Sequence, residues 1–200
     1  MESKLYYEHV EETQSHSDEA LARLVQAGDT DSYGVLVERY QARLLRYGRK
    51  FLSDSDDIVD IVQDVFMNAY QNIQSFDTIQ SFSPWLYRIA HNAFANALKK
   101  KSYRLLSFID FDTLVSHAGR DESIDAERDQ VEIKKMIDAG LTHLAPKYRE
   151  VLVLYYLEGM SYKAIADIVR VPVGTVGIRI RRAKKQLRLI YAKLNISYGA

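Results

Sequence analysis

Apolar residues recur at spacings of three and four along most of this chain, which is the pattern of amphipathic helices. The clearest case lies in residues 53–73, where the apolar positions follow the i, i+3, i+4, i+7 template: Ile58, Ile61, Val62, Val65, Phe66, Ala69, Tyr70 and Ile73. No stretch shows the sustained two-residue alternation of a half-buried strand. The pattern therefore predicts an all-α protein.

Capping and helix-breaking residues give the limits of the other helices in the first half of the chain. We expect a short helix over residues 18–28, ending at a glycine, and a longer one over residues 31–52. A further helix is predicted to begin with Ser83 as its N-cap and Pro84 as its first residue, and to continue to residue 101.

Residues 102–128 lose this periodicity and are acidic, and a segment of that length is too long for a tight connection inside a compact domain. We therefore predict two helical domains, residues 18–101 and 129–195, joined by a flexible acidic linker at 102–128 and preceded by an N-terminal extension, residues 1–17. In the second domain the pattern predicts helices over 131–144 and 146–157, and then two short helices on either side of "VRVPV".

Composition places limits on the class of protein. Of the 200 residues 47% are hydrophobic, enough for a folded core, and the absence of cysteine excludes disulfides and thiolate metal sites. The longest apolar run, Val151 to Leu157, is far shorter than the ~20 residues of a membrane-spanning helix. The first 20 residues lack the layout of a signal peptide. These features predict a soluble cytoplasmic protein without a membrane-inserted segment.

Motifs of enzyme active sites are missing from the sequence. It contains no HExxH, CxxC, GxSxG, GxGxxG or P-loop motif, and its five histidines are never paired at metal-ligand spacing. The Asp-rich helix lacks the glycine-turn loop of a calcium site. We therefore expect no catalytic residue, no metal, no cofactor and no enzymatic activity.

Charge is strongly zoned, although the formal net charge is zero. Residues 51–87 hold six Asp and no Lys or Arg, whereas residues 88–104 hold five Lys or Arg and no acid. Residues 110–132 hold eight acids against two Arg, and residues 168–200 hold eight Lys or Arg and no acid. The alternation indicates separate surfaces for separate partners. Solvated helix faces that cluster by chance are the alternative.

The C-terminal basic region has the layout of a helix-turn-helix. Ser161 can cap a first helix, the pattern breaks at Arg170-Val171, and Pro172 is placed to begin a second helix. That second helix has one continuous apolar stripe: Val176, Ile180, Ala183, Leu187, Ile190 and Leu194. The stripe would hold the helix to its domain and leave the opposite side for a ligand.

The side away from this stripe is suited to DNA. At 100° per residue, Thr175, Ile178, Arg179 and Arg182 share that side, and Arg181, Lys184, Lys185 and Arg188 widen the basic surface. We expect residues 174–179 to approach base edges in a major groove and the later cations to contact phosphates. The alternative is an amphipathic packing helix with a solvated basic face.

Three stretches resemble one known family. The sequence "LAPKYREVLVLYYLEGMSYKAIADIVRVPVGTVGIRIRRAKKQLR" resembles the −35-binding domain of extracytoplasmic-function (ECF) sigma factors, and "DIVQDVFMNAYQNIQSF" and "SFSPWLYRIAHN" resemble their −10-binding domain. The resemblance runs from about residue 18 to about residue 194. It implies a promoter-specificity subunit that binds core RNA polymerase, recognises −10 and −35 promoter elements and promotes DNA opening.

The resemblance also implies roles for individual residues. Asp60, Gln63 and Asp64 match the segment that binds the β′ clamp helices, and the loop at 75–83 matches the one that captures a flipped −10 base. The implied −10 residues are Phe82, Trp85, Arg88, Asn92, Lys99, Lys100 and Lys101, and the implied −35 residues are Gly174, Thr175, Ile178, Arg179, Arg182 and Lys185. Further implied partners are the β flap of the polymerase and an anti-sigma factor.

The chain departs from the family at the helix-turn-helix. Arg170 stands where members often have Gly, and Gly177-Ile178 replace a common Lys-Ser pair, so the family's −35 preference does not transfer directly. The rival interpretation is a helix-turn-helix regulator that does not act as a sigma subunit. Such a regulator needs a β/α receiver or a ligand pocket ahead of its DNA-binding domain, whereas residues 18–101 are helical in pattern throughout.

Overall fold

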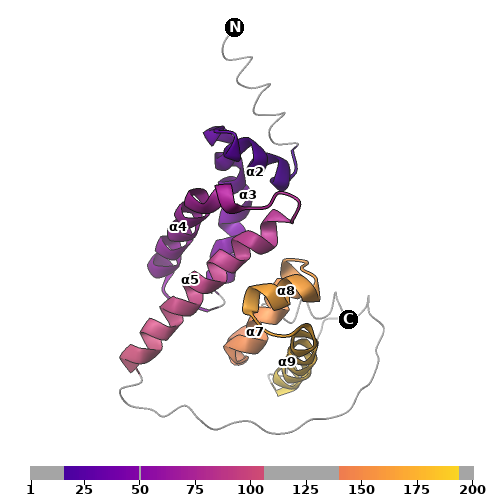
Figure 1. The fold of residues 1–200 in the computed structure, drawn as a ribbon. Coiled ribbons are helices and arrows are strands. Elements are labelled where there is room, and N and C mark those ends of the chain that lie inside the picture. The colour runs from indigo at the N-terminus through magenta and orange to yellow at the C-terminus, as the bar shows by residue number, and fades with distance from the viewer. Residues whose placement is uncertain (1–15, 50, 106–139, 194–200) are drawn as a thin grey trace, which may run out of the picture. The chain divides into compact units, whose positions relative to one another are not determined.

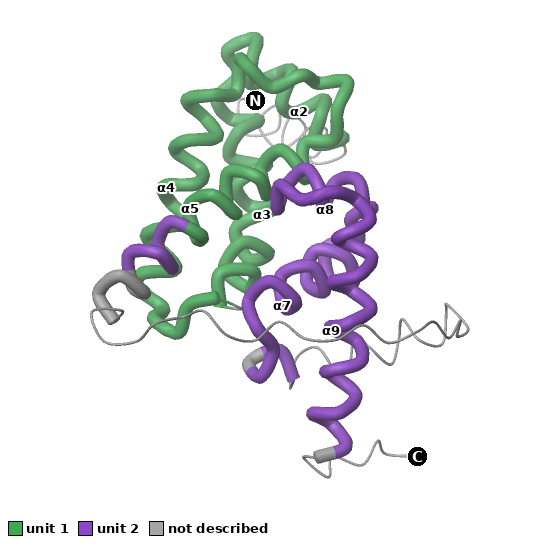
Figure 2. Tube along the Cα trace, turned by 60° about the horizontal axis from the view of Figure 1, so that its bottom comes forward, with its two compact units in different colours: residues 1–95 green, residues 96–200 purple. Residues whose placement is uncertain are grey.

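The computed structural model describes residues 16–49, 51–105 and 140–193, and within these ranges all regular structure is helical (Figure 1). The prediction of an all-α protein is confirmed. The helices are α2 (Asp18–Gln26), α3 (Thr30–Arg49), α4 (Ser55–Asn72), the 3-10 turn η1 (Ile73–Ser75), α5 (Phe82–Leu105), the 3-10 turn η2 (Leu141–His143), α7 (Pro146–Leu152), the π-helical turn η3 (Val153–Leu157), α8 (Tyr162–Val169) and α9 (Val173–Lys193). The chain divides into two compact units, residues 1–95 and 96–200 (Figure 2).

Side-chain caps set the limits of the first helices. The Ser17 hydroxyl accepts a hydrogen bond from the backbone N–H of Ala20 at 3.2 Å, and Gly28 follows α2 with a φ of +104°. A left-handed residue after the last turn favours glycine because it has no Cβ. The Asp29 carboxylate then accepts from the N–H of Ser32 at 3.3 Å and of Asp31 at 3.0 Å, so α3 begins at residue 30.

The core of the first unit is rich in aromatic rings. Tyr47 of α3 packs edge-on against Tyr87 and Phe94 of α5, with ring centroids 5.3 and 5.7 Å apart. A Cβ on the neighbouring Gly48 would lie 2.6 Å from Phe94 and 2.7 Å from Ile58. Glycine at this position therefore allows α4 and α5 to approach α3 closely.

Helix α5 begins two residues before the predicted start, at Phe82, so the assignment of Ser83 as its N-cap is wrong. Pro84 is tolerated as the third residue because N–H groups of the first turn have no partner within the helix. The Glu19 carboxylate of α2 instead accepts from the N–H of Phe82 at 3.0 Å. At its other end α5 extends to Leu105, so the first four residues of the predicted linker are helical.

The remaining domain limits stay a prediction, because residues 106–139 lie outside the described residues. This gap also contains most of the helix predicted over 131–144. The described end of that segment, Leu141–His143, is a 3-10 turn. The acidic linker predicted at 102–128 is therefore described only for its first four residues.

In the second unit the start of α7 at Pro146 is confirmed, and the last turn of that predicted helix is the π-helical η3. The Ser161 hydroxyl caps α8 by accepting from the N–H of Ala164 at 3.2 Å, as predicted. Helix α9 is 21 residues long, so the prediction of a short helix there is wrong. Its length follows from the apolar stripe, of which Val176, Ile180, Ala183 and Leu187 are at most 3% exposed.

The turn between α8 and α9 is set by a left-handed residue. Arg170 has φ 53° and ψ 51°, which confirms the predicted break, and it is the one non-glycine residue with positive φ in the described ranges. Pro172 precedes α9 rather than beginning it, one residue from the predicted position. Its carbonyl accepts from the N–H groups of Thr175 at 2.9 Å and Val176 at 3.3 Å.

Candidate functional site

The outward face of α4 is acidic. Asp60, Gln63 and Asp64 are all exposed, while the opposite side of the helix supplies the buried residues Ile58, Val62, Val65, Phe66 and Ala69. The helix is anchored at its start by Asp54, whose carboxylate accepts from the N–H groups of the next turn. The fold thus holds three predicted polymerase-binding residues on one rigid helix, available to a basic partner.

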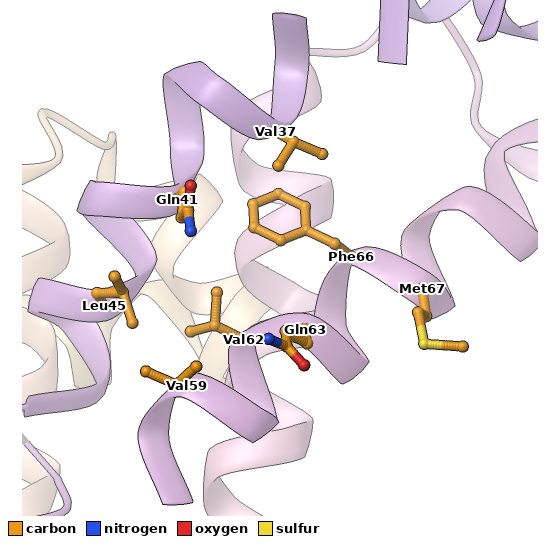
Figure 3. Close-up of a pocket in the computed structure, with 8 residues that line it drawn as sticks. All are labelled: Val37, Gln41, Leu45, Val59, Val62, Gln63, Phe66 and Met67. Atoms are coloured by element: carbon orange, nitrogen blue, oxygen red, sulfur yellow. The ribbon is translucent and has the colours of Figure 1, made fainter. Parts of the chain in front are cut away.

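An apolar groove adjoins these residues, between α3 and α4 (Figure 3). Its volume is about 360 Å³, and it is lined by Val37, Gln41, Leu45, Val59, Val62, Gln63, Phe66 and Met67. Met67 is 61% exposed and Val59 is 42% exposed. Gln63 belongs both to the groove and to the acidic face, so one partner could engage both. The groove is absent from the predictions above, and its signal is the two apolar residues outside the buried stripe of α4.

Two residues of α2 hold the loop between η1 and α5: Gln26 at its start and Glu19, which accepts from the N–H of Phe82, at its end. The Gln26 side-chain amide donates to the carbonyls of Ile73 at 2.7 Å and Phe76 at 2.8 Å. Within the loop, the Asp77 carboxylate accepts from the N–H of Ile79 at 3.0 Å. Ile79 lies within the loop that these bonds fix, and 92% of its surface is exposed. Ile79 is also absent from the predicted residues, and its one signal is an apolar side chain inside a polar loop.

The side chain of Phe82, one of the predicted −10 residues, is buried in this structure. Its side chain is 1% exposed and packs against Tyr40, Phe76 and Trp85, with ring centroids 5.5 to 5.6 Å apart. A buried ring offers no face on which a base can stack. The burial of its ring argues against Phe82 as a −10 contact, which stays a prediction. Trp85 is only partly buried, and its ring centroid lies 5.0 Å from that of Phe76.

The other predicted −10 residues lie along α5, which contains no acidic residue. Arg88 is exposed, and Asn92, one turn further, is half-buried. Lys99 and Lys100 are exposed, whereas Lys101 lies in the helix but its side chain is outside the description. A spacing of four and then seven residues places Arg88, Asn92 and Lys99 on one side. This side can meet a nucleic-acid backbone without repulsion.

The predicted −35 residues lie on α9 away from its buried stripe. Gly174, Ile178, Arg182 and Lys185 are exposed, and Thr175 and Arg179 are half-buried. Eight Lys or Arg and no acid follow residue 167 in the sequence. The structure therefore brings all six predicted residues to one helix with a cationic outward side.

Tyr162, the first residue of α8, adds a group that the sequence pattern did not single out. Its ring lies 5.1 Å from that of Tyr155, and a Cβ on Gly177 would lie 3.5 Å from its Cε2 atom. Burial, with a smaller effect of Tyr155, raises the pKa of the Tyr162 phenol. The hydroxyl is therefore protonated at neutral pH, and a phenol that is 37% exposed can donate a hydrogen bond to a phosphate.

Neither a metal site nor a membrane-spanning helix is found in the described residues. No group of three or more His, Asp or Glu residues there is arranged to hold a metal ion. Within the same ranges, no helix combines the length and apolar character that crossing a membrane requires.

Comparison with known proteins matches both units to one family. Residues 36–104 match the model of sigma-70 region 2, and residues 134–187 match that of sigma-70 region 4. The ECF RNA polymerase sigma factor SigW of Bacillus subtilis is 34% identical over 170 residues, covering 82% of this chain and 91% of its own. The ECF RNA polymerase sigma-E factor of Haemophilus influenzae is 33% identical, covering 86% of this chain and 93% of its own.

A solved structure agrees with these relatives. CnrH, in complex with the cytosolic domain of CnrY, is 25% identical and superposes with a TM-score of 0.64 over 89% of this chain and 99% of CnrH. The chain belongs to the ECF sigma factors of RNA polymerase. It is a sigma subunit with a role in promoter recognition, and a helix-turn-helix regulator outside this family is not favoured.

Proposed function

We propose that three surfaces of this sigma factor divide the work of initiation. The acidic face of α4 and its groove bind core polymerase, α5 and the loop before it bind the −10 element, and the outward side of α9 binds the −35 element. This division is supported by the opposite charges of α4 and α9, which are otherwise similar helices.

The polymerase contact combines charge with apolar packing. Asp60 and Asp64 would pair with basic side chains of the β′ clamp helices, and the groove beside Gln63 would take an apolar side chain from the same partner. An apolar pocket next to charged residues is the usual anatomy of a protein interface. The β flap is the expected second polymerase contact.

At the −10 element, Arg88 and Asn92 are suited to base edges because they offer hydrogen-bond donors on one side of α5. Lys99, Lys100 and Lys101 would contact phosphates and stabilise the separated strand. Ile79, at the tip of the anchored loop, would lie against an unstacked base. Trp85 packs against Phe76 of that loop, and because it is only partly buried it would add a further contact with the −10 strand.

At the −35 element, the first turns of α9 would enter the major groove. Gly174, Thr175, Ile178 and Arg179 would face base edges, while Arg182 and Lys185 would neutralise phosphates. Tyr162 would add a phosphate contact from α8. Most of the affinity would come from the phosphate contacts, so binding would weaken steeply with salt.

The chain itself would catalyse no reaction and would act in the cytoplasm, together with polymerase. The family resemblance implies a further partner, an anti-sigma factor that holds the chain inactive. CnrH was solved in complex with the cytosolic domain of CnrY, which is the kind of protein complex we expect for this chain.

Transcription in vitro tests the proposal directly. Purified core RNA polymerase is incubated with genomic DNA fragments, with and without this protein, and the 5′ ends of the transcripts are sequenced. We expect a set of discrete start sites that appears only with the protein and shares −35 and −10 sequences. If no start site depends on the protein and the protein does not retain core polymerase in a pull-down, the proposal fails.

A further inference from the structure

The outermost position of α9 in its base-facing turns is occupied by an apolar side chain. Ile178 lies two residues after Val176 and two before Ile180, so at 100° per residue it is about 160° away from each around the helix axis. Val176 and Ile180 are 0% and 3% exposed, whereas Ile178 is 43% exposed. Ile178 therefore contributes little to the packing of its own unit.

The surroundings of Ile178 leave it open to a ligand. Gly174 lies one turn earlier on the same side, and a Cβ there would have no neighbouring atom within 4 Å. Arg182, one turn later, is exposed and cationic. Ile178 is thus flanked on its side of the helix by Gly174, which has no side chain, and by the cationic Arg182. The helix can therefore approach a base edge closely at this point.

The second glycine of this helix has a different environment. A Cβ on Gly177 would make an ordinary contact of 3.5 Å with Tyr162, so this position faces α8. Gly174 faces the open side. The two glycines of α9 therefore do not form one DNA-facing strip, and the base-reading surface is centred on Ile178.

An isoleucine has no donor or acceptor, which restricts what it can recognise. In the major groove thymine alone presents a methyl group, beside its O4 acceptor. Adenine and guanine present N7 together with an N–H or carbonyl group, and cytosine presents an N–H group and a smaller C5–H. Covering such a polar group with an apolar side chain removes its water without replacing the hydrogen bond, which is unfavourable. The thymine methyl is therefore the major-groove group that is most complementary to Ile178.

We propose that Ile178 selects a thymine in the −35 element by packing against its 5-methyl group. This inference rests on the proposed function, in which α9 enters the major groove. It adds a specificity: the chain prefers thymine at one −35 position because of a side chain that offers only apolar contact.

Replacing thymine by deoxyuridine removes only the methyl group and tests the inference. Holoenzyme formed from core polymerase and the full chain selects duplexes from a library randomised across the −35 region. Each thymine of the selected duplex is then replaced singly by deoxyuridine, and affinities are measured for the unchanged chain, Ile178→Ala and Ile178→Val. Leu189→Ala is the matched control, since Leu189 is an exposed apolar residue of α9 three turns further on, 55% exposed.

We expect one thymine whose replacement weakens binding by the unchanged chain about fourfold, the value of one buried methyl group. Ile178→Ala should bind both duplexes equally, whereas Ile178→Val and Leu189→Ala should keep the discrimination. The inference is overturned if no thymine shows this dependence on residue 178, or if the selected site lacks a required thymine. Failure of the holoenzyme to form or to bind any duplex would instead refute the proposed function.

Discussion

Helices α4 and α9 are built alike and yet present opposite charges to solvent. Each is long, 18 and 21 residues, and each is held by one buried apolar stripe. The free side of α4 has aspartates beside an apolar groove, whereas the free side of α9 has arginines and lysines around one isoleucine. The buried stripe thus determines where each helix packs, and the opposite side determines which partner it can meet.

The largest expected effect comes from reversing the charge of α4. The double substitution Asp60→Lys/Asp64→Lys should weaken core polymerase binding roughly 100-fold, because like charges placed across an interface repel strongly. Affinity of labelled protein for core enzyme, measured by fluorescence anisotropy, checks this. Glu38→Lys, an exposed acid of α3 outside the groove lining, should bind core normally. An equal loss in that control would mean that net charge alone matters.

Reversing one charge on α9 should produce the opposite pattern. Arg182→Glu should weaken duplex binding by holoenzyme about tenfold and lower the salt dependence by about one counterion, since one phosphate contact is lost. Core affinity should stay unchanged. Arg23→Glu on α2 is the matched control, because it makes the same change at an exposed arginine of the first unit. Loss of core affinity in Arg182→Glu would break the separation of the two surfaces.

The two sides of α9 should respond differently to the same kind of substitution, glycine to alanine. Gly177→Ala should raise the free energy of unfolding by about 1 kcal/mol, because alanine favours the helix and its methyl group fits against Tyr162. DNA affinity should be retained. Gly174→Ala places a methyl group on the open side and should weaken DNA binding. Urea denaturation and duplex affinity measure the two effects, and weaker DNA binding by Gly177→Ala would contradict the assignment of sides.

The smallest effect concerns the turn before α9. Arg170→Gly should raise the free energy of unfolding by about 0.5 kcal/mol, since relief of the left-handed conformation exceeds the extra entropy of glycine in the unfolded chain. Arg170→Ala keeps the unfavourable φ and should show no such gain. Urea denaturation of both variants is the measurement. A loss of stability in Arg170→Gly would show that the arginine side chain supports the fold.

These helices could be predicted from the sequence because the burial of one helix face requires apolar residues at regular spacings of three and four. Val176, Ile180 and Leu187 repeat at helical spacing, and Ser161 and Gly28 mark ends by capping chemistry that involves only neighbouring residues. The exposure of Asp60 and Asp64 follows from the same periodicity. Local pattern is therefore sufficient to place these helices and their outward faces.

Features that arise where several helices pack together could not be predicted in this way. Phe82 is buried because Tyr40 and Phe76 from other segments surround it, and its helix starts early because Glu19 of α2 accepts its N–H. The groove beside Gln63 exists only where α3 and α4 pack. Such features depend on residues that are distant in the sequence, so a local pattern cannot predict them in full. Val59 and Met67 indicate only the α4 side of the groove.

Site-specific photo-cross-linking tests most directly the claim that α4 and α9 serve different partners. A photoreactive amino acid is placed at position 63 or at position 182 of the full chain, holoenzyme is assembled on promoter DNA, and the products are identified after irradiation. We predict that position 63 cross-links to the β′ subunit and not to DNA, and that position 182 cross-links to DNA at the −35 element. Cross-links from both positions to the same partner would contradict the assignment of α4 to polymerase and α9 to DNA.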